Sequence, residues 1–245
     1  HEYNRQELRD GRLVQLFDRY ATYNGSNPYQ TPATLSVISH LEHNLGAFIP
    51  EGGMFQITES LYRQALRLGI KFHFCKPVLK VETTNGQVSG VWLDSGFVAA
   101  DIVVSDIDIH RFYSLLLPDN NRLAKITQEE RSSSALIFYW GMKSVSPELD
   151  IHNIFFSSDY QDEFEHLFRQ KDLCNDPTIY IYISSKYNPT DAPEGCENWF
   201  VMINAPADTG QHWDELIAQS RQRIKNKQER IIGKKLSDCI VSEQI

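Results

Sequence analysis

The sequence lacks the short motifs that most often mark enzyme chemistry. Its 245 residues contain no G-x-S-x-G, H-E-x-x-H, G-x-x-x-x-G-K-[ST] or G-x-G-x-x-G pattern. These patterns carry, in turn, the nucleophile of many hydrolases, a zinc site, a phosphate-binding loop and the first turn of a dinucleotide-binding fold. Hydrolases, zinc peptidases, nucleoside triphosphatases and a complete dinucleotide-binding domain are therefore not supported.

Cysteine is scarce and poorly spaced for metal or redox chemistry. The four cysteines, at positions 75, 174, 196 and 239, form no C-x-x-C pair. Neither a zinc site nor a redox pair is indicated, and a reducing cytosol is the expected compartment. His40 and His43 lie three residues apart on an expected helix, but Glu42 points off their shared face and no third ligand follows nearby. We expect no metal site.

The sequence also lacks an excess of positive charge and any long apolar run. The formal net charge is -8, which argues against a nucleic-acid partner because phosphate neutralisation needs clustered lysine and arginine. The one basic-rich stretch, 221–235, is interpreted as a solvated helix face, with an anionic membrane surface as the alternative. No stretch approaches the roughly 20 apolar residues that span a bilayer, so insertion is excluded but attachment to a membrane surface is not.

The segment between Pro50 and Asp108 has the most regular pattern. It predicts a helix that Gly69 ends, followed by short strands, two of which are joined by the Asn85-Gly86 hairpin signal. The expected elements are a helix at 54–68 and strands at 70–74, 78–83, 87–93 and 102–104, the last of them buried. Such a helix and β-meander is too small and too one-sided to be a whole domain.

The flanking segments predict a sheet layered with helices. Clean alternation or unbroken apolar runs indicate strands at 135–140, 178–184 and 198–204. Apolar residues at helical spacing indicate helices at 9–20, 33–44, 159–168 and 212–225. The fold class is therefore α+β, with mixed α and β elements.

Six blocks of sequence resemble, in the same order, those of carotenoid desaturases of the phytoene-desaturase group. They are FDRYATYNGSNPYQTP at 17–32, LEHNLGAFIPEGGM at 41–54, SSSALIFYWG at 132–141, HNIFFSSDYQDEF at 152–164, DPTIYIYIS at 176–184 and APEGCENWFVMINAPA at 192–207. The resemblance spans most of the chain. It implies the substrate domain of a flavin amine oxidase-like fold, with a mixed β-sheet, together with an incomplete piece of the FAD-binding domain.

This resemblance implies a domain division and a cofactor. Residues 1–48 and 111–245 would form the two parts of the substrate domain, the second with a C-terminal helix and tail, and residues 49–110 the partial FAD-binding domain. The main chain of Val78 would contact FAD, and Gly52 and Gly53, which open the inner segment, are assigned to the cofactor side. The glycine-rich opening of the family is not in this sequence, so we expect a fragment that is inactive and binds little or no FAD alone.

The implied reaction removes a hydride and a proton from a long apolar carotenoid, phytoene or a later C40 compound, and so extends its conjugated double bonds. By resemblance, Asp10, Arg19 and Tyr20 are the candidate catalytic residues. Their structural alternatives are a helix N-cap for Asp10, a surface ion pair for Arg19 and packing for Tyr20.

A hydrocarbon substrate calls for an aromatic and aliphatic tunnel. Tyr23, Phe138, Tyr139 and Trp140 are the candidate lining residues, although the run at 135–140 also fits an ordinary core strand.

Two other functions fit the same pattern. One is a related flavin enzyme, such as a carotenoid isomerase or a retinol saturase. The other is a non-catalytic module that binds an apolar ligand or docks on a membrane. For the full-length enzyme we expect a cytoplasmic location with peripheral contact to the inner face of a membrane, because its substrate is a membrane lipid.

Overall fold

The computed structural model describes residues 1–245, which divide into two units. The outer unit combines residues 1–46 with residues 131–245, and the inner unit comprises residues 47–130. The inner unit therefore runs past the predicted boundary at residue 110. Both units contain helices and antiparallel strands, so the α+β class is confirmed.

The outer unit is built on one five-stranded sheet with the strand order β5-β6-β7-β4-β8. Its strands are β4 (Ser134–Met142), β5 (His152–Phe155), β6 (Ile179–Tyr182), β7 (Glu197–Ala205) and β8 (Ile240–Gln244). Every neighbouring pair is antiparallel, so the expectation of a mixed sheet is corrected. The long pairing of β4 with β7, from Ser134 opposite Ala205 to Met142 opposite Glu197, forms its centre.

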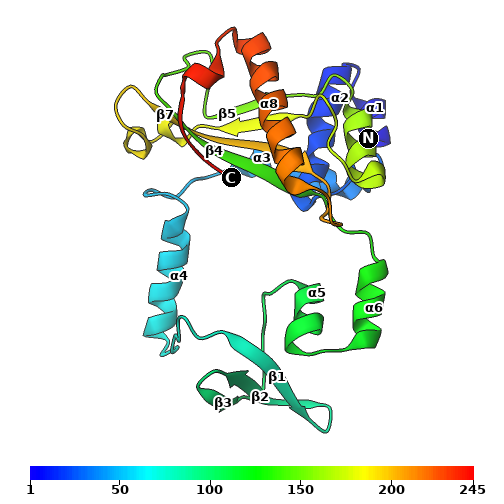
Figure 1. The fold of residues 1–245 in the computed structure, drawn as a ribbon, viewed down its shortest axis with the longest axis vertical. Coiled ribbons are helices and arrows are strands. Elements are labelled where there is room, and N and C mark those ends of the chain that lie inside the picture. The colour runs from blue at the N-terminus through cyan, green and yellow to red at the C-terminus, as the bar shows by residue number, and fades with distance from the viewer. The chain divides into compact units, whose positions relative to one another are not determined.

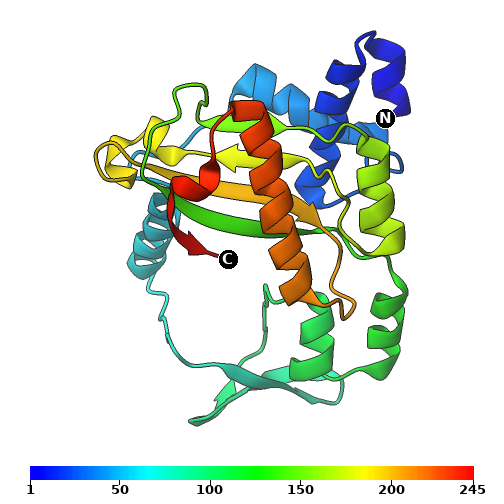
Figure 2. The ribbon, with the colours of Figure 1, turned by 45° about the horizontal axis from the view of Figure 1, so that its top comes forward.

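Helices lie before and between the strands of this sheet along the sequence. They are α1 (Glu2–Glu7), α2 (Gly11–Asp18), a 3-10 segment (Arg19–Asn24), a 3-10 turn (Ala33–Leu35), α3 (Ser36–Leu45), α7 (Tyr160–Glu165) with a π-helical turn (His166–Gln170), and α8 (Trp213–Ile232). Short 3-10 turns at Ser184–Lys186, Pro189–Asp191 and Leu236–Asp238 complete the unit. α8 lies across one face of the sheet in both views (Figures 1 and 2).

Strand alternation places the core under α8. Along β7 every second residue from Glu197 to Ala205 is buried, and the same alternation runs from Leu136 to Met142 in β4. Because successive side chains of a strand point to opposite faces, one face of the sheet is closed and the other is only partly covered. The closed face holds the large rings of Phe138, Trp140 and Trp199, which cluster with Ile224 of α8.

Each buried charged side chain of the outer unit is ion-paired or hydrogen-bonded. Lys227 of α8 is 5% exposed and donates to the carbonyl oxygens of Phe156 and Pro177, at 2.8 and 2.9 Å, and pairs with the Asp176 carboxylate at 2.8 Å. These bonds satisfy the ammonium group, which would otherwise be costly to bury, and attach the middle of α8 to the segments beside the sheet.

The inner unit contains a helix, a three-stranded sheet and a short helical segment. Its elements are α4 (Phe55–Arg67), β1 (Val78–Thr84), β2 (Gln87–Leu93), β3 (Gly96–Ala99), α5 (Ile109–Arg111) with a π-helical turn (Phe112–Leu116), and α6 (Asn120–Gln128). The strand order is β1-β2-β3, with the predicted Asn85-Gly86 turn between the first two. Val81 is the one buried hydrophobic residue of this unit, so the unit has almost no core of its own.

Two predicted strands of the inner unit are wrong. Residues 70–74 and 102–104 are irregular, and Ile102 and Val104 are 78% and 90% exposed rather than buried. The third strand of the meander is instead β3, in a region where no strand was predicted. A strand exists only where a neighbour supplies hydrogen bonds, and nothing in this unit pairs with either apolar run.

Several helix boundaries also differ from prediction. The helix expected to reach residue 20 changes to 3-10 geometry at Arg19, and the helix expected at 33–44 begins as a 3-10 turn and becomes α-helical at Ser36. The helix expected to end near residue 225 continues to Ile232, where Gly233 ends it in a left-handed conformation. Helix ends depend on caps and tertiary contacts more than on periodicity.

The two faces of β4 should respond differently to truncation. We expect Phe138→Ala to lower the free energy of unfolding by about 3–5 kcal/mol, because it empties a fully buried site. Tyr139→Ala should cost about 1 kcal/mol or less, because that ring is 51% exposed and packs mainly on Phe200. Denaturant unfolding measures both, and equal losses would contradict the assigned faces.

Candidate functional site

The partly covered face of the five-stranded sheet carries a row of aromatic side chains. The strand register places His152, Tyr182, Phe200 and Tyr139 opposite one another in succession across β5, β6, β7 and β4. The rings of His152 and Tyr182 stack at 5.2 Å, and those of Phe200 and Tyr139 meet edge to face at 5.5 Å. The result is an apolar strip that runs across the strands.

A groove of about 540 Å³ is lined by three of the four residues of this row, all but His152. Its volume lies within the range of about 300–1,000 Å³ that is usual for sites binding small molecules. Half of its lining residues are aromatic, and polar groups come from β8 and from Asn198 of β7. The lining residues are Tyr139, Trp140, Gly141, Tyr182, Asn198, Trp199, Phe200, Ser242, Glu243 and Gln244.

A carboxylate bonded by two tyrosines forms a polar cluster in the helical segments that precede the sheet. Tyr20 and Tyr23 each donate a hydrogen bond to one oxygen of Glu42, at 2.8 and 2.5 Å, and their rings stack at 5.6 Å with only 10° between the planes. Both tyrosines belong to the 3-10 segment, in which residues i and i+3 eclipse each other. The change from α-helix to 3-10 helix at Arg19 therefore aligns the two hydroxyls on one acceptor.

Gly25 ends this 3-10 segment and fixes its position. Its φ of 67° is left-handed, and a β-carbon at this position would approach the Cβ of Ser132 to 2.7 Å. The backbone amide of Ser133 also donates to the carbonyl of Gly25 at 2.8 Å. The segment bearing both tyrosines is thereby held against the start of β4, and only glycine fits there.

Arg19 connects the tyrosine pair to the aromatic row. Its guanidinium lies 5.2 Å from the ring centroid of Tyr180, which is on the same face of the sheet as Tyr182. The Tyr180 hydroxyl in turn lies 2.8 Å from Nδ1 of His152. The guanidinium makes no ion pair and no side-chain hydrogen bond in the structure, so its donors are available next to the aromatic surface.

The two tyrosines of the cluster are neutral over the physiological pH range. Burial is the main cause that raises the pKa of each to about 12, and the hydrogen bond to Glu42 raises it further, while the nearby charge of Arg19 acts in the opposite direction. Tyr20 and Tyr23 are therefore permanent donors to the carboxylate.

The sequence-predicted catalytic residues are only partly brought together. Arg19 and Tyr20 lie in the cluster, but Asp10 is at the opposite end of α2, about 12 Å away along eight residues of helix. Asp10 accepts from the backbone amide of Arg12 as an N-cap, and its side-chain bond to the guanidinium of Arg12 lowers its pKa to about 2. These contacts match the structural alternative of a helix N-cap, and the catalytic role of Asp10 stays a prediction.

The predicted substrate-binding residues lie on two different faces. Tyr23 and Tyr139 are on the partly covered side, where they are 58% and 51% exposed. Phe138 and Trp140 point into the core, where Arg221 and Lys225 of α8 lie over their rings, although Trp140 also borders the groove. Three consecutive residues of a strand cannot line one surface. We therefore keep Tyr139 as a candidate substrate-binding residue and withdraw Phe138 from that set.

The predicted cofactor-binding residues are in the inner unit. Val78 is the first residue of β1, and Gly52 and Gly53 form the turn before α4, with φ of 81° and 87°. Nothing lies within 4 Å of a β-carbon added to Gly53, so its main chain is open to the surroundings. Their role in cofactor binding stays a prediction.

Glu42, Tyr180, His152 and Phe200 were missed by sequence reasoning. Glu42 was considered only as a metal ligand, and the structure contains no group of residues that could hold a metal ion. The alternation of TIYIYIS could have marked Tyr180 and Tyr182 as neighbours on one face. No sequence signal pairs Glu42 with tyrosines 22 and 19 positions earlier.

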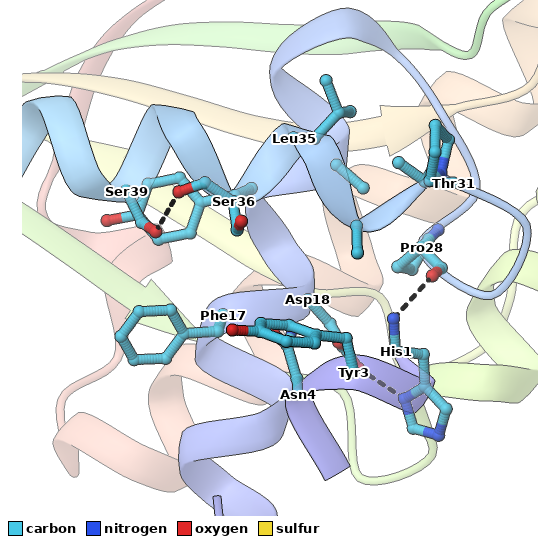
Figure 3. Close-up of a pocket in the computed structure, with 14 residues that line it drawn as sticks. His1, Tyr3, Asn4, Phe17, Asp18, Pro28, Thr31, Leu35, Ser36 and Ser39 are labelled. Atoms are coloured by element: carbon cyan, nitrogen blue, oxygen red, sulfur yellow. Dashed lines mark hydrogen bonds and ion pairs between the residues drawn. The ribbon is translucent and has the colours of Figure 1, made fainter. Parts of the chain in front are cut away.

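A second cavity, between α1, α2 and the turn before α3, is too small for such a role. Its volume is about 40 Å³, close to that of one water molecule, and Figure 3 shows Asp18 inside it, bonded to His1. Asn4 also donates to this carboxylate, at 2.8 Å, and burial raises the pKa of Asp18. No helix of the structure is both long and apolar enough to cross a membrane.

Comparisons with solved structures define the class of fold. The chain matches an oxidoreductase from Methanosarcina mazei with a TM-score of 0.65 and 14% identity, over 99% of the chain and 54% of that protein. A protein from Pyrococcus furiosus matches with a TM-score of 0.63 and 13% identity, over 99% of the chain and 56% of that protein. At these identities the likeness establishes the fold, which is that of about half of an oxidoreductase.

Comparisons with curated proteins define the family. The 1-hydroxycarotenoid 3,4-desaturase of Flavobacterium sp. (strain P99-3) is 48% identical over 96% of the chain and 48% of its own length. The phytoene desaturase of Fusarium fujikuroi is 28% identical over 96% of the chain and 45% of its length, and the 4,4'-diaponeurosporene oxygenase of Staphylococcus aureus (strain USA300) is 32% identical over 95% and 48%. No protein-family model matches the chain.

The chain is a relative of the carotenoid and phytoene desaturases, as the sequence blocks predicted. It spans about half the length of the curated relatives that it matches.

The pKa of Tyr23 should depend on Glu42. In Glu42→Gln we expect that pKa to fall from about 12 toward its ordinary value of 10.0, because a neutral amide no longer repels the phenolate, while burial keeps part of the shift. A rapid alkaline jump with phenolate absorbance measures it, as the difference between each protein and its Tyr23→Phe variant. Tyr29, raised to about 12 without a bond to Glu42, is the control and should not move. An unchanged Tyr23 would contradict the arrangement.

Proposed function

We propose that the chain is part of a FAD-dependent carotenoid desaturase, which removes a hydride and a proton from a carotenoid and so extends its conjugated double bonds. The observation that carries the proposal is the aromatic row of the sheet, with the guanidinium of Arg19 over the neighbouring ring of Tyr180. Its support from relatives is the 48% identity to a 1-hydroxycarotenoid 3,4-desaturase over 96% of the chain. A rigid polyene needs a long apolar surface, and this face of the sheet offers one.

We assign the outer unit to the substrate domain of a flavin amine oxidase-like fold and the inner unit to part of its FAD-binding domain. The support is the state of the inner unit, whose large apolar side chains remain exposed on several elements. They include Phe55, Ile57, Leu61, Phe74, Trp92, Phe97, Val98, Ile102 and Val104. A domain that buried these residues would need additional chain, which fits a sequence spanning about half of its relatives.

The inner unit offers surfaces compatible with a dinucleotide cofactor. Val78 is 37% exposed at the start of β1, and the turn at Gly52 and Gly53 presents main chain without side chains. We assign these three residues to main-chain contacts with FAD, which ask little of side-chain identity. When bound, FAD supplies the acceptor for the hydride. The protein's own residues then have to bind and orient the carotenoid and exclude water from it.

In this proposal each element of the site has a separate task. Tyr139, Tyr182 and Phe200 bind the apolar chain and keep water from it. Arg19 and Tyr20 act at the polar end of the row, where the oxygens of Glu42 are the acceptors able to receive a proton. For the full-length enzyme we propose a cytoplasmic location with peripheral contact to a membrane, since carotenoids reside there.

A carotenoid oxygenase is the second candidate function. It is favoured by the 32% identity to a 4,4'-diaponeurosporene oxygenase and the 30% identity to a 4,4'-diapolycopene oxygenase of Methylomonas sp.. The two candidates differ in their products, because a desaturase removes hydrogen and an oxygenase adds oxygen. The mass of the product separates them.

The first test uses the full-length protein with a C40 carotenoid in membranes or detergent. We expect a flavin absorption spectrum and a new polyene band at longer wavelength, from a product lighter by two hydrogen atoms. A product heavier by oxygen would instead support the oxygenase. Bound flavin or carotenoid without any product would support a non-catalytic module, and an isomerised product of unchanged mass would support the isomerase.

The second test asks whether the aromatic row binds the substrate. Tyr139→Asp puts a charge on an apolar wall, and we expect it to lower the desaturation rate by about 10-fold or more, because the carotenoid would desolvate a carboxylate. Tyr187→Asp is the control, since Tyr187 is exposed and lies outside both the row and the groove. Equal rates in the two variants would show that the row is not the binding surface.

A further inference from the structure

The strand register sets a row of small side chains beside the aromatic row of the sheet. Gly141 of β4 lies opposite Asn198 of β7 on one side and opposite Ser242 of β8 on the other. Both neighbours of Gly141 in β4 are buried in the core, so this position faces the same side of the sheet as Tyr139, two residues earlier. Asn198, Gly141 and Ser242 therefore form a second row, the small row, which runs parallel to the aromatic row.

The small row is low because its side chains are short or turned aside. The side-chain amide of Asn198 donates to Oγ of Ser184 at 2.7 Å and accepts from the backbone amide of Ser185 at 3.0 Å, which commits it to the turn after β6. Gly141 has no side chain, and that of Ser242 is short. The groove of about 540 Å³ is lined by the whole small row and by three rings of the aromatic row. The small row therefore forms part of the floor of the groove, and the aromatic row forms a wall.

Gly141 keeps the middle of this floor empty. Its φ is not positive, so the backbone conformation does not call for glycine here. A β-carbon at this position would collide with the hydroxyl of Ser242 and lie 3.7 Å from Cγ2 of Val241. A larger residue would push the Ser242 side chain away and raise the floor. Space is therefore the property that this glycine provides.

The floor runs across the strands, not along them. It crosses β7, β4 and β8, which is about 15 Å at the strand spacing of about 4.8 Å. β8 is an edge strand, so the groove leads past Ser242 to the edge of the sheet. Toward the other end of the aromatic row, Tyr182 belongs to the same strand as Tyr180, over which Arg19 lies. A C40 polyene is longer than this floor, and one that reacts near Arg19 would pass over Gly141 and then over Ser242.

We propose that the carotenoid chain lies on the small row, against the aromatic wall, and that the side chain at position 242 limits how long a chain the groove accepts. Residue 141 sets the same limit one strand earlier. A nearly uniform hydrocarbon chain offers no polar group for selection along its length, so steric room is the property by which this surface can discriminate. The inference rests on the proposed desaturase function and adds to it two specificity-determining positions.

The test compares substrates of different length in the full-length protein. The probes are an acyclic C40 carotenoid and apocarotenoid analogues with the same reacting end, shortened stepwise at the other end. Ser242→Phe fills the floor near the edge, and we expect the ratio of kcat/KM for the longest over the shortest substrate to fall about 10-fold or more. The loss should appear mainly in KM, because the ring removes binding room and leaves the reacting end untouched.

A second variant locates the limit. Gly141→Leu places bulk one strand closer to the reacting end, so it should also reject analogues of intermediate length that Ser242→Phe still accepts. Ser237→Phe is the matched control, because Ser237 is an exposed serine outside the groove, and it should leave the length preference unchanged. If Gly141→Leu does not fold, Ser242→Phe decides alone, since Ser242 is exposed and its replacement leaves the core intact.

Binding without turnover provides an independent measurement. Trp140 and Trp199 line the groove, so quenching of tryptophan fluorescence by bound carotenoid gives a dissociation constant for each chain length. A full-length protein that binds these carotenoids and desaturates none would overturn the proposed function, while the quenching series still tests the small row. An equal effect of Ser242→Phe on all chain lengths, or no effect on any, would overturn the length limit and leave the desaturase function standing.

Discussion

The in-register pairing of β4 with β7 is the constraint on which both the core and the candidate site depend. The two strands pair along their full nine-residue lengths without a bulge, and β6 continues the same register. Because side chains alternate, this register assigns Phe138 and Val201 to the face under α8 and Tyr139 and Phe200 to the other. A slip of one residue would bury the site and expose the core.

Charged and polar groups of the outer unit fall into two kinds. Lys227, Glu197 and Glu163 are buried and bonded on several sides. Glu197 accepts from Trp199 and pairs with Lys186 at 2.7 Å, and Glu163 accepts from Thr178 at 2.6 Å. Such groups hold the fold together and, being buried, are closed to a ligand. Arg19 and Glu42 are less enclosed and keep free donors and acceptors. This difference distinguishes candidate ligand-binding groups from groups that only stabilise the fold.

The sequence correctly predicted those helices, strands and turns whose pattern lies within a short stretch of residues. The apolar spacing of α4, the Asn85-Gly86 hairpin and the alternating strands β6 and β7 all reside in short windows. It failed at residues 70–74 and 102–104, where apolar patterns exist but no partner strand does. It also could not separate Phe138 from Tyr139, because an unbroken apolar run does not reveal which face each residue takes. Arg19, Tyr20 and Tyr23 were found through family resemblance, whereas Glu42 became visible only when the 3-10 geometry placed both hydroxyls on it.

The outer unit is discontinuous in sequence, which has a consequence for its synthesis. Residues 1–46 leave the ribosome before the inner unit, but every strand of the outer unit lies after residue 130. The early helices must therefore wait, with side chains that folding buries, such as Val14 and Ala21, in water while the whole inner unit is translated. Contacts of such long sequence separation form slowly. We infer that the nascent chain depends on chaperone protection during this interval more than a protein whose domains follow one another in order.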